Sequence, residues 1–186
     1  FTFSVSDGEF SSSASVSLSI SAVNDAPVLA TVSDVSFDED LSGSTSLSAS
    51  DVDGDSLEFS ITGGSDITAT LDGSDVSFSS PENYNGSETF TVSVTDGSET
   101  DSQSITVTVN AVNDAPLANA ATATTSEDQS VVVSLSGSDI DGDALTFSLA
   151  IDATNGNVTL EGSFATYTPN QDFNGDDSFT FSVSDG

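Results

Sequence analysis

The stretch FTVSVTDG at residues 90–97 decides the fold. Its Phe and two Val residues alternate with Thr and Ser, which predicts an antiparallel strand with one buried face, and its closing Asp-Gly predicts a turn. Variants of the same stretch occur at residues 1–8 and 179–186, each 89 residues away. A fixed period of this length indicates a tandem array of like domains.

The same two-residue alternation recurs throughout the one complete period, and no helical periodicity interrupts it. Turn residues such as Gly-Gly, Asp-Gly and Asn-Gly separate the alternating stretches. Seven short strands in fewer than a hundred residues favour a Greek-key β-sandwich. The expected strands are 28–37, 44–50, 57–61, 67–71, 75–79, 88–95 and 102–110.

The repeat boundary is the motif Asn-Asp-Ala-Pro, found at 24–27 and again at 113–116. Proline has no backbone N–H to donate and therefore suits the entry into a first strand. The predicted fold class is all-β, with tandem seven-stranded Greek-key β-sandwich domains in an extended array. Its expected parts are the last two strands of a preceding repeat (1–23), a complete repeat (24–112) and a repeat without its final strand (113–186).

Residues 1–23 allow two interpretations. In the first, the sequence is a window cut from a longer array, and these residues end a domain that begins further upstream. In the second, the strand 14–22 of one chain completes residues 113–186 of the next, which would build a head-to-tail fibre by strand donation.

The charge balance limits the possible partners. The chain has 31 acidic residues and no Lys, Arg or His, for a net charge of −31. Self-repulsion of this size strains a compact domain, and because the acids gather in short clusters between strands we expect bound divalent cations to offset it. Nucleic acid is excluded as a partner because its phosphates would be repelled. No apolar run is long enough for membrane insertion, and there is no signal-peptide pattern.

The densest acidic clusters have the pattern Asp-x-Asp-Gly-Asp. They comprise Asp51, Asp53 and Asp55 in one period and Asp139, Asp141 and Asp143 in the next. Hard oxygen ligands at this density suit Ca²⁺. The pattern does not match the helix-flanked calcium loop, because its Gly stands at the fourth position and no Glu stands at the twelfth.

In this order the motifs resemble the cadherin-like tandem repeats of large bacterial surface adhesins. Phe-x-Val-x-Val-x-Asp-Gly, an alternating strand and then Asn-Asp-Ala-Pro match the end of a cadherin domain at 90–116 and at 1–27. The resemblance implies Ca²⁺ between successive domains. The linkers depart from the cadherin pattern at two positions. An Asp of that pattern is replaced by Ala22 and Ala111, and an Asn is replaced by Ala26 and Ala115. Because fewer side-chain ligands remain, the resemblance implies one or two ions per junction.

The resemblance also implies which residues bind the metal. The junction near residue 24 would use acids and an amide of the complete repeat, and the junction near residue 113 would add an acid from the upstream repeat. The implied ligands are Asn24, Asp25, Asp51, Asp53 and Asp96 at the first junction, and Glu39, Asn113, Asp114, Asp139, Asp141 and Asp185 at the second.

The expected function is an extracellular, calcium-rigidified spacer or stalk in a bacterial adhesin or surface fibre, with neighbouring repeats of the same chain as partners. Cell-surface or matrix glycans or proteins would bind through other domains. No enzyme is expected, since the chain has no His, Cys, Lys or Arg for acid–base or nucleophilic chemistry. The alternatives are a strand-donating filament subunit and a carbohydrate-binding module, for which only Tyr84 and Tyr167 offer exposed aromatic candidates.

Overall fold

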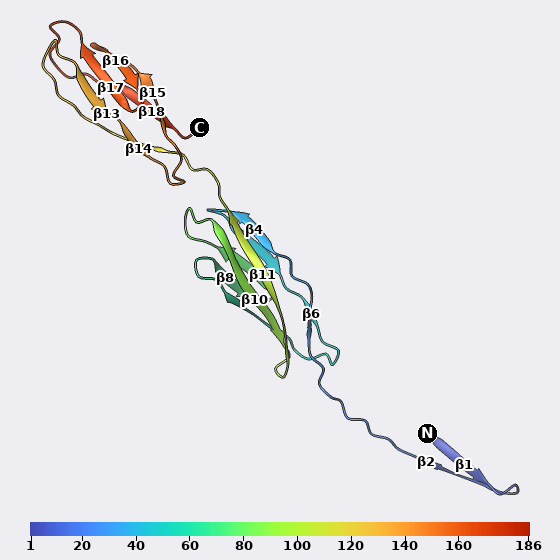
Figure 1. Ribbon diagram of the computed structural model, residues 1–186. Helices are drawn as coiled ribbons and strands as arrows, with labels where there is room; N and C mark the ends of the chain where they lie inside the picture. The colour runs from blue at the N-terminus through green and yellow to red at the C-terminus, as the bar shows by residue number, and fades with distance from the viewer. The chain divides into compact units, whose positions relative to one another are not determined.

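A computed structural model describes residues 1–186, and every regular element in it is a β-strand (Figure 1). The chain forms two units. Unit 1 comprises Phe1–Phe37, Leu41–Pro81 and Gly86–Val109; unit 2 comprises Asp38–Asp40, Glu82–Asn85 and Asn110–Gly186. The predicted all-β class of tandem sandwich repeats is confirmed. No helix is present that could cross a membrane.

Unit 1 is a sandwich of two main sheets. The larger has the order β4-β11-β10-β7, the smaller has the order β5-β9-β8, and β3 and β6 form a separate pair. The strands are β3 (Val28–Leu29), β4 (Val35–Asp38), β5 (Ser42–Ser46), β6 (Ala49–Ser50), β7 (Glu58–Gly63), β8 (Thr68–Asp72), β9 (Asp75–Ser79), β10 (Gly86–Thr95) and β11 (Thr100–Asn110).

The core of unit 1 comes from the alternation that the sequence displays. On β10 the side chains of Phe90, Val92 and Val94 are fully buried, while the Thr and Ser residues between them face outward. Phe90 meets Phe78 of β9 edge to face, with ring centroids 5.3 Å apart. Strands β10 and β11 pair in register with Phe90 opposite Ile105, which brings the apolar faces of both strands into one layer.

Two expected strands are divided in the structure. The stretch 28–37 becomes β3 and β4, because the backbone of Val32 bonds to a side chain and not to a neighbouring strand. The Gln103 Oε1 accepts from the Val32 N–H (3.1 Å), and the Gln103 Nε2 donates to the Val32 carbonyl (2.8 Å). The stretch 44–50 becomes β5 and β6, because the chain passes from one sheet to another at Leu47, whose N–H donates to the Ser74 carbonyl.

Unit 2 repeats this plan with fewer strands. Its sheets have the orders β13-β17-β16, β15-β18 and β12-β14, around a core of Leu135, Val158 and Ala165. Within 113–186 no strand takes the position that β11 holds in unit 1. The strands are β12 (Leu117–Asn119), β13 (Val131–Ser134), β14 (Ser136–Ser138), β15 (Thr146–Ile151), β16 (Gly156–Glu161), β17 (Phe164–Pro169) and β18 (Thr180–Ser184).

The first residues form a hairpin of β1 (Thr2–Ser6) and β2 (Ser11–Ser15), with Phe3 opposite Ala14. The Val16 N–H continues the hairpin by donating to the Phe1 carbonyl (3.0 Å), and residues 17–27 belong to no strand. The apolar side chains of this segment are exposed, including Leu18 (73%) and Ile20 (93%).

One carboxylate in each unit fixes a loop. Glu88 of β10 accepts from the Ser65 hydroxyl (2.6 Å) and from the backbone N–H groups of Ser65, Asp66 and Ile67. These bonds, the Ser65 hydroxyl first, lower the pKa of Glu88 to about 2. In unit 2 the equivalent carboxylate, Asp177, accepts from the N–H groups at 154 and 155 and from the Tyr167 hydroxyl.

The Glu88 contacts predict a pH dependence of stability. Because folding lowers the pKa of Glu88 from 4.5 to about 2, its contribution is complete above pH 4.5 and is lost as the pH falls toward 2. Glu88→Gln is expected to lower the melting temperature of unit 1 at pH 7 by roughly 4–8 °C, for a loss of about 1 kcal/mol, and to have little effect at pH 2. Glu58→Gln, at an exposed site on β7, is the control and should change neither value.

Candidate metal centre

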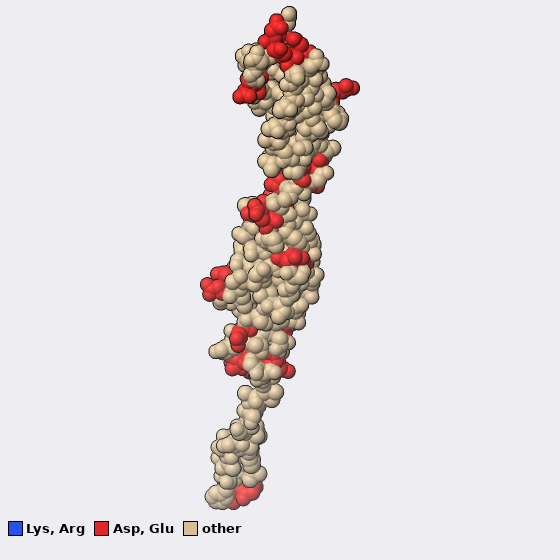
Figure 2. Space-filling view, turned by 90° about the vertical axis from the view of Figure 1, so that its left-hand side faces the viewer, with Lys and Arg blue, Asp and Glu red and all other residues tan.

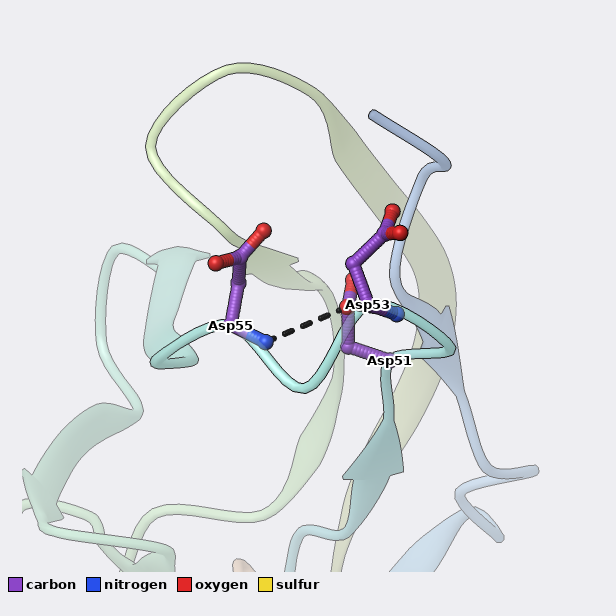
Figure 3. A group of neighbouring side chains, drawn as sticks. All are labelled: Asp51, Asp53 and Asp55. Atoms are coloured by element: carbon purple, nitrogen blue, oxygen red, sulfur yellow. Dashed lines mark hydrogen bonds between the residues drawn. The ribbon is translucent and has the colours of Figure 1, made fainter. Parts of the chain in front are cut away.

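The Asp-x-Asp-Gly-Asp loop of unit 1 is folded by its own first residue. Asp51 follows β6, and its Oδ1 accepts from the N–H groups of Asp53 (2.9 Å), Gly54 (3.0 Å) and Asp55 (3.3 Å). Gly54 permits the tight turn because its φ is +80°. Figure 3 shows the three carboxylates on the same side of the loop, and one oxygen from each lies within 4.8 Å of the others.

Unit 2 contains a second copy of this loop. The Oδ1 of Asp139 accepts from the N–H of Asp143 (3.2 Å), Gly142 has φ +82°, and the carboxylates of Asp139, Asp141 and Asp143 again lie within 4.8 Å of one another. The first Asp of each loop, Asp51 or Asp139, has its other oxygen, Oδ2, buried without a hydrogen-bond partner.

The linker motif Asn-Asp meets each loop in the same way. In unit 1 the Asn24 amide donates to Asp96 Oδ2 (2.9 Å), and the N–H of Asp25 donates to Asp53 Oδ2 (2.8 Å). The structure therefore brings together all five residues that the sequence assigned to the first junction.

The same contacts recur in unit 2. The Asn113 amide donates to Asp185 Oδ2 (2.7 Å), and the N–H of Asp114 donates to Asp141 Oδ2 (2.8 Å). Residues separated by 72 positions are thus joined in both repeats. The same donors and acceptors recur in both repeats, which indicates that this contact is part of the repeat's fold.

Glu39 is the upstream acid expected at the second junction, and the structure groups it with unit 2. It follows β4, its N–H donates to the Asn110 carbonyl (2.9 Å), and its Oε1 accepts from the N–H of Val112. Only 4% of Glu39 is exposed, and its Oε2 has no partner. A buried carboxylate oxygen without a donor is costly unless a cation neutralises it.

The acidic groups around Asp114 repel one another. Burial of Asp114 raises the pKa of its carboxyl, and the neighbouring charges of Asp141, Asp40, Glu39 and Asp139 raise it further, in that order. Asp114 Oδ2 and Asp139 Oδ2 join Glu39 Oε2 as buried oxygens without partners. The chain has no Lys, Arg or His that would neutralise this group.

Hydrogen bonds hold Asp96, the last Asp of the complete repeat. The Oδ1 of Asp96 accepts from the N–H groups of Ser98 (2.6 Å) and Glu99 (2.7 Å). The Glu99 bond, then the Asn24 amide and the Ser98 bond, lower the pKa of Asp96. Asp96 is therefore fixed in position and favoured in its charged form.

Sequence reasoning left three acids out of the site. Asp55 and Asp143 have no counterpart in the cadherin pattern, yet the structure places their carboxylates beside those of the other loop residues. Asp40 lies close enough for its charge to raise the pKa of Asp114. Two signals were present in the sequence: Asp-x-Asp-Gly-Asp recurs, and the pair Glu39-Asp40 recurs 88 residues later as Glu127-Asp128.

On the face drawn in Figure 2, the Asp and Glu side chains lie in separate groups with uncharged surface between them. The candidate ligand atoms at the linker end of each repeat are oxygen atoms alone, from carboxylates and an Asn side-chain amide. Such a set favours Ca²⁺ over the nitrogen- and sulfur-preferring transition metals.

Fold and site together define the class: tandem β-sandwich repeats of the Ig-like and cadherin-like kind, with an acidic cluster at the linker end of each repeat. The chain belongs to the bacterial Ig domain family, whose model matches residues 24–109 and 113–186. Repeats of this class are typically non-enzymatic structural modules of extracellular surface proteins. The predicted resemblance to cadherin-like tandem repeats is thereby confirmed.

Among solved structures, two forms of human protocadherin-24 EC1-2 share the fold. The first is 19% identical, with 87% of this chain and 94% of that chain covered and a TM-score of 0.50. Form II is 17% identical, with 87% and 95% covered and a TM-score of 0.52. At this identity the likeness shows the fold alone. A search of curated proteins found no match.

Proposed function

We propose that this chain is a run of extracellular spacer repeats from a bacterial adhesin or surface fibre, and that Ca²⁺ bound at the domain junctions makes the run stiff. The observation that carries the proposal is the group of three buried carboxylate oxygens without partners, on Glu39, Asp114 and Asp139. A divalent cation neutralises such a group, and nothing else in the chain does, because the chain has no cationic side chain.

The ion at the second junction would be held by carboxylates of Glu39, Asp114, Asp139 and Asp141, with Asp143 and Asp185 completing the oxygen set. Asn113 would position Asp185 through its amide, and the first junction would use the equivalent residues of unit 1. Bound Ca²⁺ would supply charge neutralisation and directional metal–oxygen bonds to groups that otherwise repel each other.

Ca²⁺ would link repeats because the residues that hold it come from separate parts of the array. Glu39 lies within the repeat 24–112, Asn113 and Asp114 form the linker, and the Asp139 loop belongs to the repeat 113–186. An ion shared by all three ties neighbouring repeats of the same chain together. Sugars or proteins bound by the whole adhesin would then be contacted through other domains.

The carbohydrate-binding alternative is less well supported. Sugar platforms need exposed, flat aromatic side chains. Of the two Tyr candidates, Tyr167 is half-buried and donates its hydroxyl to Asp177 (3.0 Å), and Tyr84 is half-buried as well.

Stiffness is the property that a spacer needs, and small-angle scattering measures it. In Ca²⁺ we expect a single extended particle with a narrow distribution of dimensions, and in chelator a broad, flexible distribution, because like charges then repel across a short linker. High monovalent salt should screen this repulsion without restoring stiffness, since screening supplies no directional bonds. Identical scattering curves in Ca²⁺, in chelator and in chelator with salt would show that Ca²⁺ does not control the junction.

A further inference from the structure

The far end of the repeat 24–112 forms part of the same compact unit as the linker and the next repeat. This end consists of the turn Asp38–Asp40, between β4 and β5, and the loop Glu82–Asn85, which precedes β10; both belong to unit 2, together with Asn110–Gly186. We call these two segments the tip. The proposed metal site uses Glu39 of the tip, and the contacts of the other tip residues determine how Glu39 is held.

Asp40 and Asn83 join the two segments of the tip. The N–H of Asn83 donates to Asp40 Oδ1 (3.0 Å), and we call this contact the tip latch. Both residues have left-handed backbone, with φ +62° for Asp40 and +56° for Asn83. Residues other than glycine seldom adopt this conformation, and Asp and Asn tolerate it best. Such backbone persists only where the surrounding structure holds it, which here is the latch itself.

The next repeat contains the same latch. The N–H of Asp172 donates to Asp128 Oδ1 (3.1 Å), and these two residues have φ +55° and +60°. Asp128 lies 88 positions after Asp40, and Asp172 lies 89 positions after Asn83. These four are the only residues of the chain other than glycine that have positive φ. The latch is therefore a regular part of the repeat's fold.

The first latch holds the turn that carries Glu39. Glu39 directly precedes Asp40, its Oε1 accepts from the N–H of Val112, and its Oε2 is buried without a partner. On the other side of Glu39, Asp38 Oδ1 accepts from the Asn110 amide (3.0 Å). The neighbours of Glu39 are thus fixed on both sides. Because Glu39 is buried, the direction of its Oε2 depends on the conformation of this turn.

We propose that Asp40 and Asn83 are positioning residues of the metal site: their latch fixes the turn so that Glu39 Oε2 is aimed at the cation before the cation binds. This inference rests on the proposed calcium site. Groups that orient a metal ligand typically contribute about 10- to 100-fold to metal affinity. Asp40 acts here through its hydrogen bond and not through its charge, so an uncharged acceptor in its place serves equally well.

Three variants of the 186-residue chain separate these roles, and each removes one negative charge. Asp40→Gly deletes the acceptor of the latch and keeps the left-handed backbone, because Gly adopts that conformation freely. Asp40→Asn keeps both the acceptor and a residue that tolerates positive φ. Asp128→Gly is the matched control, since it deletes the latch of the other tip in the same way.

Calcium affinity, measured by isothermal titration calorimetry with CaCl₂, is the first readout. Asp40→Gly is expected to weaken one class of sites about 10- to 100-fold, whereas Asp40→Asn and Asp128→Gly should bind close to wild type. An equal loss in Asp40→Gly and Asp40→Asn would show that Asp40 acts through its charge, which overturns the latch. Wild-type affinity in Asp40→Gly, or an equal loss in Asp128→Gly, would overturn it as well.

Amide hydrogen exchange in chelator is the second readout, and it needs no bound ion. The N–H of Val112 donates to Glu39, so its exchange reports whether Glu39 stays in place. This exchange should be faster in Asp40→Gly and unchanged in Asp40→Asn and Asp128→Gly. If wild type bound no Ca²⁺, the proposed metal site would fail, and Val112 would still decide the role of the latch. Exchange of Val112 at the wild-type rate in Asp40→Gly would show that the latch does not position Glu39.

Discussion

Ca²⁺ at about 10 mM is expected to raise the melting temperature of this chain by roughly 5–20 °C over the value in chelator. Extracellular calcium modules bind with dissociation constants of about 10⁻⁴ to 10⁻³ M. A ligand that binds only the folded state then adds about 1.4 to 2.7 kcal/mol per ion at that concentration. The effect is large because the folded chain holds carboxylate oxygens that are buried without partners, on Glu39, Asp114 and Asp139.

The control separates binding from screening. NaCl at the same ionic strength also reduces the repulsion of 31 acidic residues and should raise the melting temperature slightly. Only Ca²⁺ forms directional bonds with the ligand set, so its effect should exceed that of NaCl and should saturate. If equal ionic strengths of CaCl₂ and NaCl gave the same melting curve, the carboxylates would be a solvated acidic surface and nothing more.

The second large effect concerns Glu39→Gln, whose change in melting temperature is expected to have opposite signs without and with Ca²⁺. Glu39→Gln removes a charge that is 4% exposed and keeps an acceptor for the N–H of Val112. Without Ca²⁺ the substitution should raise the melting temperature, because a buried charge with one partnerless oxygen is removed. With Ca²⁺ it should lower the melting temperature relative to wild type, because a ligand is lost. A purely structural Glu39 would give the same sign in both solutions.

The repeat offers a matched control for this experiment. Glu127 has the same place in the Glu-Asp motif of the next period, but it is exposed. Glu127→Gln should therefore change the melting temperature little in either solution. If Glu127→Gln behaved like Glu39→Gln, the response would come from net charge and not from the junction.

Much of this fold is predictable from sequence, because a two-residue alternation needs only local information. Strands such as β9 and β11 therefore lie close to where the alternation placed them. The division of 28–37 is not predictable in that way. It depends on Gln103, which lies 71 residues from Val32 and replaces backbone partners with a side-chain amide.

The candidate site also has features that the sequence predicts and features that it does not. The acidic loops are visible as a spacing, and their fold follows from one residue, since Asp51 accepts from the N–H groups after it. The pairing of Asn24 with Asp96 is not visible as a spacing, and the family resemblance alone indicated it. The burial of Glu39 was beyond both kinds of reasoning, because it depends on backbone groups of Asn110 and Val112, which lie more than 70 residues along the chain.

Calcium binding to the folded chain, followed by isothermal titration calorimetry, tests the central claim most directly. Wild type is expected to bind at least one ion per junction, with a dissociation constant of about 10⁻⁴ to 10⁻³ M. Asp139→Asn keeps the oxygen that accepts from Asp143 but removes the charge beside the partnerless Oδ2, so it should abolish or weaken one class of sites at least tenfold. Glu161→Gln, at the exposed end of β16, should titrate like wild type. An absence of saturable binding by wild type, or identical titrations for Asp139→Asn and Glu161→Gln, would contradict a calcium-stiffened junction.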